Sequence, residues 1–144
     1  MADCVFCSIV ARQADAHRVL EDEHAVAFLD RRPLFPGHLL VVPRVHHETL
    51  PDLPVTQVDP LFQRVRWLSS AVQEAMHAQG TFVAVNNVVS QSVPHLHVHI
   101  VPRTKGDGLK GFFWPRNPYE SESQMADIAA RIRDAIGVET EERR

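Results

Sequence analysis

The chain has 144 residues, 44% of them hydrophobic and 23% charged, which excludes a disordered or fibrous protein. Its formal net charge of −3 at pH 7 provides no basic surface for nucleic acid or an anionic membrane, so any anionic ligand must be bound by a local site. This length predicts one domain with one core. We expect residues 1–120 to form its body, and residues 121–144 to add a C-terminal helix and a solvated tail to the same single domain.

The net charge and the N-terminal segment together predict a cytoplasmic protein that has no membrane or nucleic-acid partner. It lacks a basic stretch followed by a long apolar run, and the chain has nowhere about 18 consecutive apolar residues. In a reducing compartment, the C-x-x-C spacing of Cys4 and Cys7 indicates metal or redox chemistry more often than a structural disulfide. A redox pair would be expected in a thioredoxin-like βαβ setting, and no such pattern follows.

The first half of the chain predicts three strands and then a long helix. The adjacent segments HRVLED and HAVAFLD predict a β-hairpin, and GHLLVVPR predicts a third strand after a loop rich in proline and glycine. A helix is predicted from about Asp59 to Gln79, with Asp59 as its cap, Pro60 in its first turn and Gly80 at its end. One face of it carries apolar residues three or four positions apart: Leu61, Val65, Leu68, Val72 and Met76.

The second half predicts two strands and a last helix. TFVAVNN reads as a strand, VVSQS as a loop, and PHLHVHIVPR alternates strictly, as a strand does. An irregular connection with the aromatic segment Phe112–Trp114 follows, and a helix is predicted from about Ser121 to Ile136, ending at Gly137. Because no helix separates the last two strands, we expect an α+β domain with an antiparallel sheet and the long helix packed on one face.

Three histidines occupy every second position of the last predicted strand: His95, His97 and His99. Residues two apart share one face of a strand and lie about 6.5–7 Å from each other along it. The alternating Leu96, Val98 and Ile100 therefore belong to the opposite, core-facing side. A zinc ion with ligands at about 2.0–2.1 Å can bind two neighbouring histidines of this row, but not the outer pair, which is about 13 Å apart. At least one imidazole must have another role.

A neutral imidazole is a nucleophile or general base at pH 7, so a row of them suits attack on phosphorus, with flanking rings that stabilise charge. The preceding segment NNVVSQS supplies possible donors to phosphate and ribose oxygens. These are Asn86, Asn87, Gln91 and Ser92. Such residues are common in loops, and their position beside the histidine row is what makes them candidates.

The pattern His-Leu-His-Val-His-Ile-Val from His95 to Val101 resembles the signature of the histidine triad (HIT) superfamily of nucleotide hydrolases and transferases. Further segments resemble successive blocks of that family in order, among them CVFCSIV, EDEHAVAFLD, PGHLLVVPRVHH, NN and GDG, and the likeness covers about Cys4 to Trp114. The resemblance implies a five-stranded antiparallel sheet with one long helix, pairing into a homodimer, and nucleotidyl chemistry at an α-phosphate.

By motif position, the resemblance implies that His97 attacks phosphorus to form a nucleotidyl-histidine intermediate, that His99 stabilises the phosphate, and that His38 joins this network. It implies that Asp30 binds ribose hydroxyls, and that Gln91 and Ser92 contact the phosphate or the leaving group. It implies a base pocket formed by Phe6, Ile9 and Phe28. A core role for these three and a turn role for Asp30 remain alternatives. His17, His24 and His77 match nothing functional.

Many prokaryotic members of the family, and the related galactose-1-phosphate uridylyltransferases, bind a structural zinc ion. The resemblance implies that its ligands here are Cys4, Cys7, His46 and His95, with His47 as the alternative to His46. Such a Cys₂His₂ set suits a closed tetrahedral site and would assign His95 to structure. We expect no organic cofactor.

Two segments depart from the family pattern. Only Val88-Val89-Ser90 separates Asn87 from Gln91, where the family usually has a longer, glycine-containing loop, so which of Asn86 and Asn87 faces the ligand stays open. Arg31-Arg32 follows Asp30 where an apolar residue is common, which favours either a charged leaving group or only a wet loop.

The leading hypothesis is a Hint/Fhit-like hydrolase or transferase acting on a purine nucleoside phosphoramidate or a related nucleotidyl conjugate, with the purine nucleotide as its ligand. A dinucleoside polyphosphate hydrolase or phosphorylase is the alternative enzyme, because PRTKGDG resembles the Fhit-type branch. A nucleotide-binding regulatory protein with vestigial turnover and a purely structural zinc module are the other classes.

Overall fold

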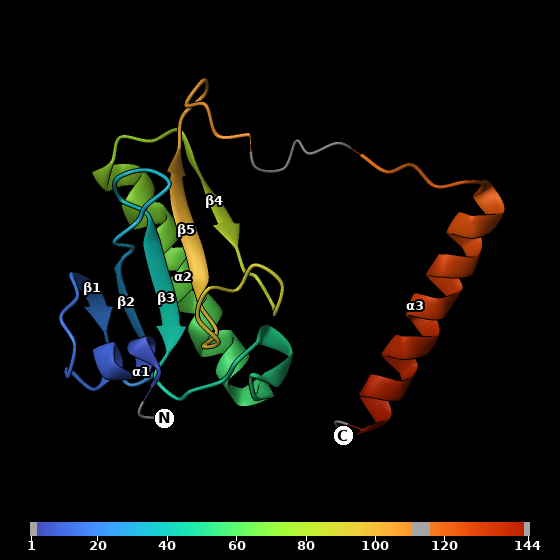
Figure 1. Ribbon diagram of the computed structural model, residues 1–144, viewed down its shortest axis with the longest axis horizontal. Helices are drawn as coiled ribbons and strands as arrows, with labels where there is room; N and C mark the ends of the chain where they lie inside the picture. The colour runs from blue at the N-terminus through green and yellow to red at the C-terminus, as the bar shows by residue number, and fades with distance from the viewer. Residues whose placement is uncertain (1–2, 111–115, 143–144) are drawn as a thin grey trace. The chain divides into compact units, whose positions relative to one another are not determined.

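The computed structural model describes residues 3–110 and 116–142, and it divides into two units, Met1–Asp107 and Gly108–Arg144. The first unit holds all the strands, and the second holds the last helix (Figure 1). The predicted grouping of residues 1–120 and 121–144 into one domain stays a prediction. The aromatic segment Phe112–Trp114 lies outside the described residues.

The first unit is built on the five-stranded antiparallel sheet that the sequence predicts. Its strands are β1 (Arg18–Glu21), β2 (Ala25–Leu29), β3 (Leu39–Pro43), β4 (Gly80–Ala84) and β5 (Val98–Arg103), in the spatial order β1-β2-β3-β5-β4 (Figure 1). Each neighbouring pair is antiparallel. The order places β5, which contains the last histidine of the row, between β3 and β4. The predicted α+β fold class is confirmed.

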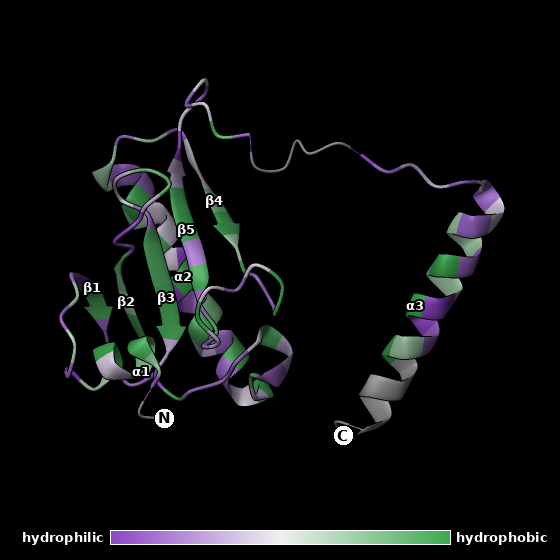
Figure 2. Cartoon of the chain, viewed as in Figure 1, coloured by the Kyte–Doolittle hydropathy of each residue, from purple (hydrophilic) through white to green (hydrophobic). Residues whose placement is uncertain are grey.

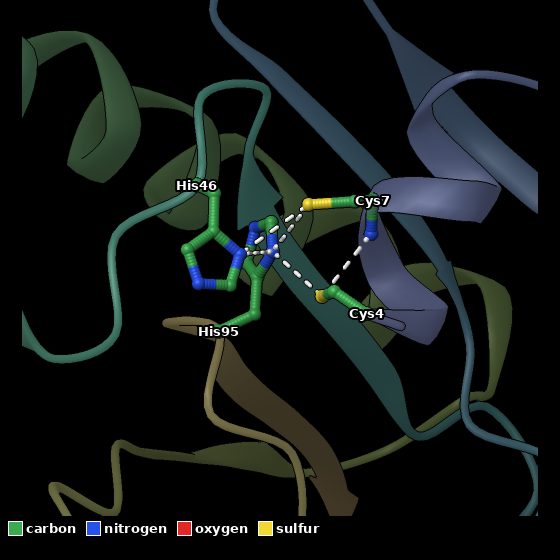
Figure 3. Close-up of side chains that lie close together, drawn as sticks. All are labelled: Cys4, Cys7, His46 and His95. Carbon is green, nitrogen blue, oxygen red and sulfur yellow. Dashed lines mark hydrogen bonds between the residues drawn. The ribbon is translucent and has the colours of Figure 1, made fainter. Parts of the chain in front are cut away.

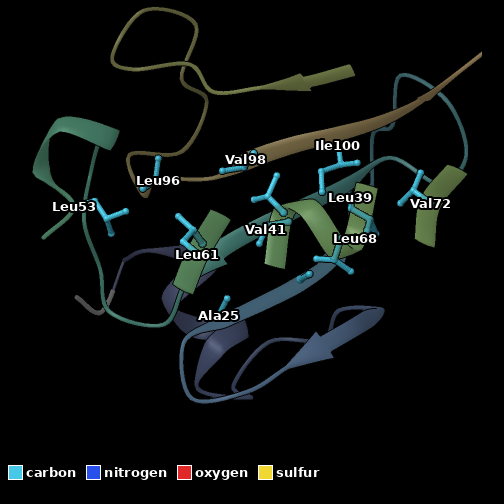
Figure 4. Close-up of a cluster of buried hydrophobic side chains, with 12 residues drawn as sticks. Ala25, Leu39, Val41, Leu53, Leu61, Leu68, Val72, Leu96, Val98 and Ile100 are labelled. Carbon is cyan, nitrogen blue, oxygen red and sulfur yellow. The ribbon is translucent and has the colours of Figure 1, made fainter. Parts of the chain in front are cut away.

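Alternation along the central strands gives the sheet two different faces. Ala25 and Ala27 of β2, Leu39 and Val41 of β3, and Val98 and Ile100 of β5 join the apolar side chains of the long helix in one cluster (Figure 4). The intervening residues of β2 and β3 form a second cluster with Phe6 and Ile9 of the N-terminal helix. These strand residues are Val26, Phe28, Leu40 and Val42. Because both faces are covered, β2 and β3 read as continuous apolar runs, green in Figure 2.

The long helix α2 covers the first of these faces. Its buried residues include Leu61, Val65, Leu68 and Val72, as their spacing predicts. The helix spans Val55–Ala75, so the expected start at Asp59 and end at Gln79 were both four residues too late. Pro54 occupies the cap position, and Pro60 lies inside the helix rather than in its first turn, where it removes only one helical hydrogen bond.

Two short helices were not predicted. The helix α1 (Val5–Val10) directly follows Cys4, whose side chain caps it by accepting a hydrogen bond from the Cys7 backbone N–H. A single 3-10 turn, η1 (Leu50–Asp52), lies in the expected loop before α2. Six residues are too few for a helical periodicity to be read from sequence, and too few for a helix that is stable without tertiary contacts.

The second unit contains α3, which spans Glu122–Glu142. The expected end at Gly137 was wrong, because the helix continues through that glycine and takes up part of the expected tail. No helix among the described residues carries an apolar stretch long enough to cross a membrane.

The histidine row crosses the start of β5. This strand begins at Val98, so the predicted strand start at Pro94 was too early, and His95 and His97 lie in the extended segment before it. The predicted two-sided pattern is confirmed, since Leu96, Val98 and Ile100 are fully buried in the cluster under α2. His95 and His97 are buried as well, at 0% and 3% exposure. The row therefore faces the interior of a site rather than solvent.

Candidate active site and metal cluster

The four residues of the predicted zinc set lie together. Cys4 and Cys7 come from the start of α1, His46 from the segment after β3, and His95 from the segment before β5 (Figure 3). Their ligand atoms all lie within 4.8 Å of one another. The Nδ1 atom of His95 lies 3.4 Å from Cys4 Sγ, 3.5 Å from Cys7 Sγ and 3.1 Å from His46 Nδ1.

The distances that involve sulfur fit a tetrahedral metal site, and the 3.1 Å between the Nδ1 atoms of His46 and His95 is slightly shorter than such a site requires. With Zn–S near 2.3 Å and Zn–N near 2.0–2.1 Å, tetrahedral geometry separates neighbouring ligand atoms by about 3.3–3.8 Å. The distance of 3.3 Å between Cys7 Sγ and His46 Nδ1 agrees with this range, as do the contacts of His95 with the two sulfurs. Two thiolates and two imidazoles also form a donor set that zinc prefers. The cluster can hold a zinc ion.

Hydrogen bonding makes His95 a suitable ligand. Its Nε2 lies 3.1 Å from the carbonyl oxygen of Pro43, and because a carbonyl oxygen can only accept, Nε2 carries the proton. The lone pair is then on Nδ1, which faces the two sulfurs. Burial lowers the His95 pKa to about 4, so the ring is neutral at pH 7. Burial and the neighbouring Cys4 raise the pKa of the Cys7 thiol, so metal binding must release a proton there.

The structure distinguishes between the two candidate histidines after β3. His46 Nδ1 points into the cluster, whereas His47 is absent from it. The buried Nε2 of His47 has no hydrogen-bond partner, and the backbone carbonyl of the same residue accepts from the Leu96 N–H at 2.7 Å. His47 therefore ties its segment to the histidine row through the backbone, and the geometry favours His46 as the ligand.

A cavity of about 740 Å³ opens on the α1 side of the sheet and has an apolar wall and a polar end. Phe6 and Ile9 of α1 and Phe28 of β2 line the wall, and His97, His99 and Ser92 line the cavity as well. Asp30, Arg31 and Arg32 also reach it. Of the predicted site residues, the structure thus brings seven to one cavity: Phe6, Ile9, Phe28, Asp30, Ser92, His97 and His99.

Two contacts fix the orientation of the His97 ring. Its Nδ1 lies 2.7 Å from the backbone carbonyl oxygen of His95, so Nδ1 is the protonated nitrogen and donates to that oxygen. The lone pair is therefore on Nε2. The Phe6 ring packs edge-on against the imidazole, with ring centroids 5.1 Å apart and an interplanar angle of 80°. A backbone acceptor and an aromatic ring together orient the side chain.

His38 and His99 form a chain of directed hydrogen bonds beside it. The Leu34 N–H donates to His38 Nδ1 at 3.0 Å, so a neutral His38 carries its proton on Nε2. That nitrogen lies 3.0 Å from His99 Nδ1, which must accept. His99 is left with its proton on Nε2 and lines the cavity as a hydrogen-bond donor next to His97. His38 itself is 3% exposed and orients His99 from behind.

The same hydrogen bonds argue against a second metal site. Asp30, His38 and His99 lie close enough to surround an ion, with 3.7 Å between Asp30 Oδ2 and His38 Nε2. However, His38 Nε2 carries a proton as long as Leu34 donates to Nδ1, so it offers no lone pair to a metal. Asp30 Oδ1 is already bonded to the Arg32 N–H. This group is better described as a hydrogen-bond network in which the position of each ring proton is fixed.

Burial keeps the network neutral. It lowers the pKa of His99 to about 4, with further lowering by His97 and His38. Burial also lowers the pKa of His38, although the nearby Asp30 carboxylate opposes this. At pH 7 these rings act as neutral donors and acceptors, and not as cations.

The loop between β4 and the histidine row uses its polar side chains internally. The Asn86 side chain donates to the Ser90 carbonyl, Asn87 Oδ1 accepts from the Leu50 N–H, and the Gln91 amide bridges the Val88 N–H and the Glu48 carbonyl. None of these three side chains lines the cavity, and their roles in ligand binding stay predictions. The loop contains no glycine, yet Val88 and Ser90 adopt positive φ angles of 68° and 61°.

One glycine is required where the chain approaches His38. Gly37 has φ +96°, a backbone conformation that residues other than glycine rarely adopt. A Cβ atom added to it would lie 2.6 Å from Cγ of Met76, at the end of α2. The P-G-H segment thus lets the chain turn against α2 and place His38 behind His99.

Comparison with known proteins identifies the family. The family model of the HIT domain matches residues 11–106. The adenylylsulfatase HINT3 of Arabidopsis thaliana is 34% identical over 109 residues, which are 74% of this chain and 55% of the relative. Protein hit of Bacillus subtilis is 33% identical over 138 residues, which are 90% of this chain and 94% of the relative. The asymmetrical bis(5'-nucleosyl)-tetraphosphatase of Schizosaccharomyces pombe is 35% identical over 85 residues, which are 58% of this chain and 47% of the relative.

Solved structures are similar over most of the chain. The structure of SMU.412c from Streptococcus mutans UA159 has a TM-score of 0.85 and 34% identity, and covers 94% of this chain and 87% of that chain. A zinc-bound histidine triad family protein from Mycobacterium smegmatis has a TM-score of 0.72 and 36% identity, and covers 93% of this chain and 98% of that chain. The sequence match and the shared fold agree, and the chain belongs to the histidine triad (HIT) family.

Proposed function

We propose that the protein is a nucleotidyl hydrolase or transferase that acts at the α-phosphate of a purine nucleoside phosphoramidate or a related nucleotidyl conjugate. The observation that carries this proposal is the directed hydrogen bonding at the end of the cavity. It leaves a lone pair on His97 Nε2 and a proton on His99 Nε2, side by side at one end of an apolar pocket. A nucleophile beside a donor is the arrangement that attack on a phosphoryl group requires.

The proposed reaction has two steps. The His97 Nε2 lone pair attacks phosphorus, the bond from phosphorus to the leaving amine breaks, and the amine departs with a proton taken up from solvent. Water then attacks the same phosphorus and releases one proton to solvent, the bond to His97 breaks, and a nucleoside monophosphate leaves with His97 neutral again. His99 donates to the phosphoryl oxygens in both steps, and the aromatic wall with Phe6 and Phe28 holds the base.

Trapping of the intermediate tests the proposal. The protein is mixed with an adenosine phosphoramidate labelled at phosphorus, quenched within milliseconds, and digested. We expect acid-labile label on the peptide that contains His97, and no label on His97→Ala protein that still binds AMP. Wild-type turnover by the His97→Ala variant would overturn the proposal.

A dinucleoside polyphosphate hydrolase or phosphorylase is the second candidate. It is supported by the relative whose name is bis(5'-nucleosyl)-tetraphosphatase, and by Arg31 and Arg32, which line the cavity and carry positive charge for additional phosphates. The adenylylsulfatase HINT3 adds a third kind of leaving group among relatives. Rates on phosphoramidate, diadenosine tri- and tetraphosphate and adenylyl sulfate, with and without inorganic phosphate, separate these candidates. A nucleotide-binding protein with vestigial turnover would bind AMP and leave every substrate intact.

We also propose that the cysteine–histidine cluster holds a structural zinc ion. The distances and donor types support it, and so does the zinc-bound relative from Mycobacterium smegmatis. Zinc measured in protein purified without added metal is expected at about one ion per chain. Two freely titratable thiols in metal-free, folded protein would contradict the assignment and favour a redox role for the pair.

The homodimer is a further proposal. The strand β4 forms an edge of the sheet, where a further strand can pair, and Val83 on it and Trp67 of α2 are 42% and 50% exposed. Sedimentation equilibrium of the purified chain is expected to give twice the mass of the chain, and a monomer at micromolar concentration would contradict the proposal.

A further inference from the structure

We propose that Cys4 and Cys7 are positioning residues for the reaction at His97, because the cation they bind with His46 and His95 holds both the nucleotide pocket wall and the ring of the nucleophile. This inference rests on the proposed function and assigns the metal cluster a part in it. Two separate connections lead from the cluster to the reacting nitrogen.

The first connection runs through α1. This helix has six residues, which is too short to be stable alone, and the Cys4 side chain caps its N-terminal end. Phe6 lies between the two cysteines, and its ring contacts those of His97 and Phe28 at centroid distances of 5.1 Å and 5.4 Å. Phe6 and Ile9 both line the cavity. A cation on the two thiolates therefore holds the helix that forms the wall.

The second connection runs through the backbone of His95. Its ring is fixed at both nitrogens, by the Pro43 carbonyl at Nε2 and by the cluster at Nδ1. The carbonyl oxygen of the same residue accepts the Nδ1 proton of His97 at 2.7 Å. A shift of His95 therefore moves the acceptor that selects the His97 tautomer. Pro43 is the last residue of β3, and His46 lies in the segment after this strand. The cation therefore also ties the neighbouring strand β3 to the histidine row.

Loss of the cation is expected to change both kinetic constants. The released wall weakens nucleotide binding, and loss of most of one aromatic contact corresponds to a rise in KM of roughly tenfold. The released carbonyl lets the His97 ring turn, and a displacement of about 1 Å at a reacting group can lower kcat by about a hundredfold. A cluster that only stabilised the fold would leave both constants unchanged in protein that remains folded.

Two substitutions at one position separate metal binding from helix capping. Serine and aspartate both accept the hydrogen bond that caps α1, but only aspartate is also a good zinc ligand. We expect Cys4→Ser to lose zinc, to raise KM and to lower kcat, and Cys4→Asp to retain zinc and to recover most of both constants. Ser8→Ala in the same helix is the matched control, because Ser8 belongs neither to the cluster nor to the cavity.

A spectroscopic measurement reports on the nucleophile directly. In protein labelled with ¹⁵N-histidine, the His97 Nδ1 proton bonded to the His95 carbonyl is expected as a slowly exchanging resonance. It should be present in wild type, Cys4→Asp and Ser8→Ala, and lost or broadened in Cys4→Ser. AMP affinity measured by calorimetry should fall in parallel. Neither measurement needs turnover, so both test the connection even if the proposed reaction is wrong.

Folded Cys4→Ser protein that lacks zinc but keeps kcat, KM, AMP affinity and the Nδ1 proton within twofold of wild type would overturn the inference. If Cys4→Ser does not fold, replacement of zinc by the larger cadmium ion in wild type takes its place. Cadmium should shift the Nδ1 proton resonance and change kcat by at least threefold. Identical spectra and rates for the two metal forms would overturn the inference as well.

Discussion

The histidine row serves two regions that differ in how each imidazole holds its proton. At the metal cluster, His95 gives its Nε2 proton to a backbone carbonyl and turns the Nδ1 lone pair toward two sulfurs. At the cavity, His97 does the reverse, donating from Nδ1 and keeping the lone pair on Nε2. His99 accepts at Nδ1 and keeps a donor for the cavity. Identical side chains thus suit the proposed roles of ligand, nucleophile and donor because one neighbouring atom selects each tautomer.

The largest expected effect on kcat comes from substituting the proposed nucleophile in the cavity, compared with substituting one ligand of the cluster. His97→Asn should lower kcat by on the order of 10⁴-fold, as loss of a nucleophile does, with zinc content unchanged. His46→Asn should lose zinc and lower kcat by a smaller factor, because His97 keeps its lone pair. Zinc analysis and steady-state kinetics of the two variants check this, and a loss of zinc in His97→Asn would remove the separation.

A smaller loss is expected for the donor beside the nucleophile. His99→Ala removes a hydrogen-bond donor to charge that develops on the phosphoryl oxygens, and such a change costs about 10²–10³ in kcat with little change in KM. His24→Ala, an exposed histidine outside the cavity, is the matched control. An increase in KM with unchanged kcat would show that His99 contributes only to ground-state binding.

Removal of the metal should affect stability more than any single residue of the cavity does. If the concentration of free zinc exceeds its dissociation constant a thousandfold, binding raises the free energy of unfolding by about 4 kcal/mol. This corresponds to a rise of about 10 °C in melting temperature for a chain of this size. Calorimetry before and after chelation measures the change. A shift of less than 2 °C, together with confirmed removal of zinc, would contradict the role of the cluster as an anchor.

The smallest effect is a pH dependence of stability that belongs to the cavity. The His99 pKa is lowered from 6.5 to about 4 in the folded protein, so between these values the unfolded chain binds more protons. Stability from this group is complete above pH 6.5 and falls as the pH is lowered toward 4. The melting temperature of wild type should therefore fall more steeply over this window than that of His99→Asn. Since both proteins retain the metal cluster, their difference isolates His99, and parallel curves would contradict the lowered pKa.

The strands and the long helix could be predicted because their apolar residues repeat at the periods of a strand and a helix. The helix α1 could not, since six residues hold less than two turns and a helix this short is stabilised by tertiary contacts, here the packing of Phe6 against His97 and Phe28. The early start of α2 was missed because Pro60 looked like a first-turn proline, whereas it lies inside the helix.

The sequence predicted which residues form the site better than it predicted which partners their side chains bond. Seven of the predicted residues line one cavity, and the four predicted metal ligands lie together. The loop residues Asn86, Asn87 and Gln91 were chosen as donors by residue type, and their side chains bond within the loop or to the neighbouring segment. Residue type states what a side chain can donate or accept, but not which partner reaches it first.

The sequence by itself determined the α+β class, the two-sided alternation around the histidine row, and the impossibility of one metal ion for all three rings. These follow from periodicity and from the fixed spacing along a strand. Only the tertiary structure decided which nitrogen of each ring carries the proton, that His46 rather than His47 points into the cluster, and that Leu34 rules out a metal at His38. Those decisions depend on single contacts that form only in the folded chain. Some are with near neighbours, as at the His95 carbonyl and the Leu34 N–H, and others are with distant residues, as at the Pro43 carbonyl. The periodicity of the sequence does not encode them.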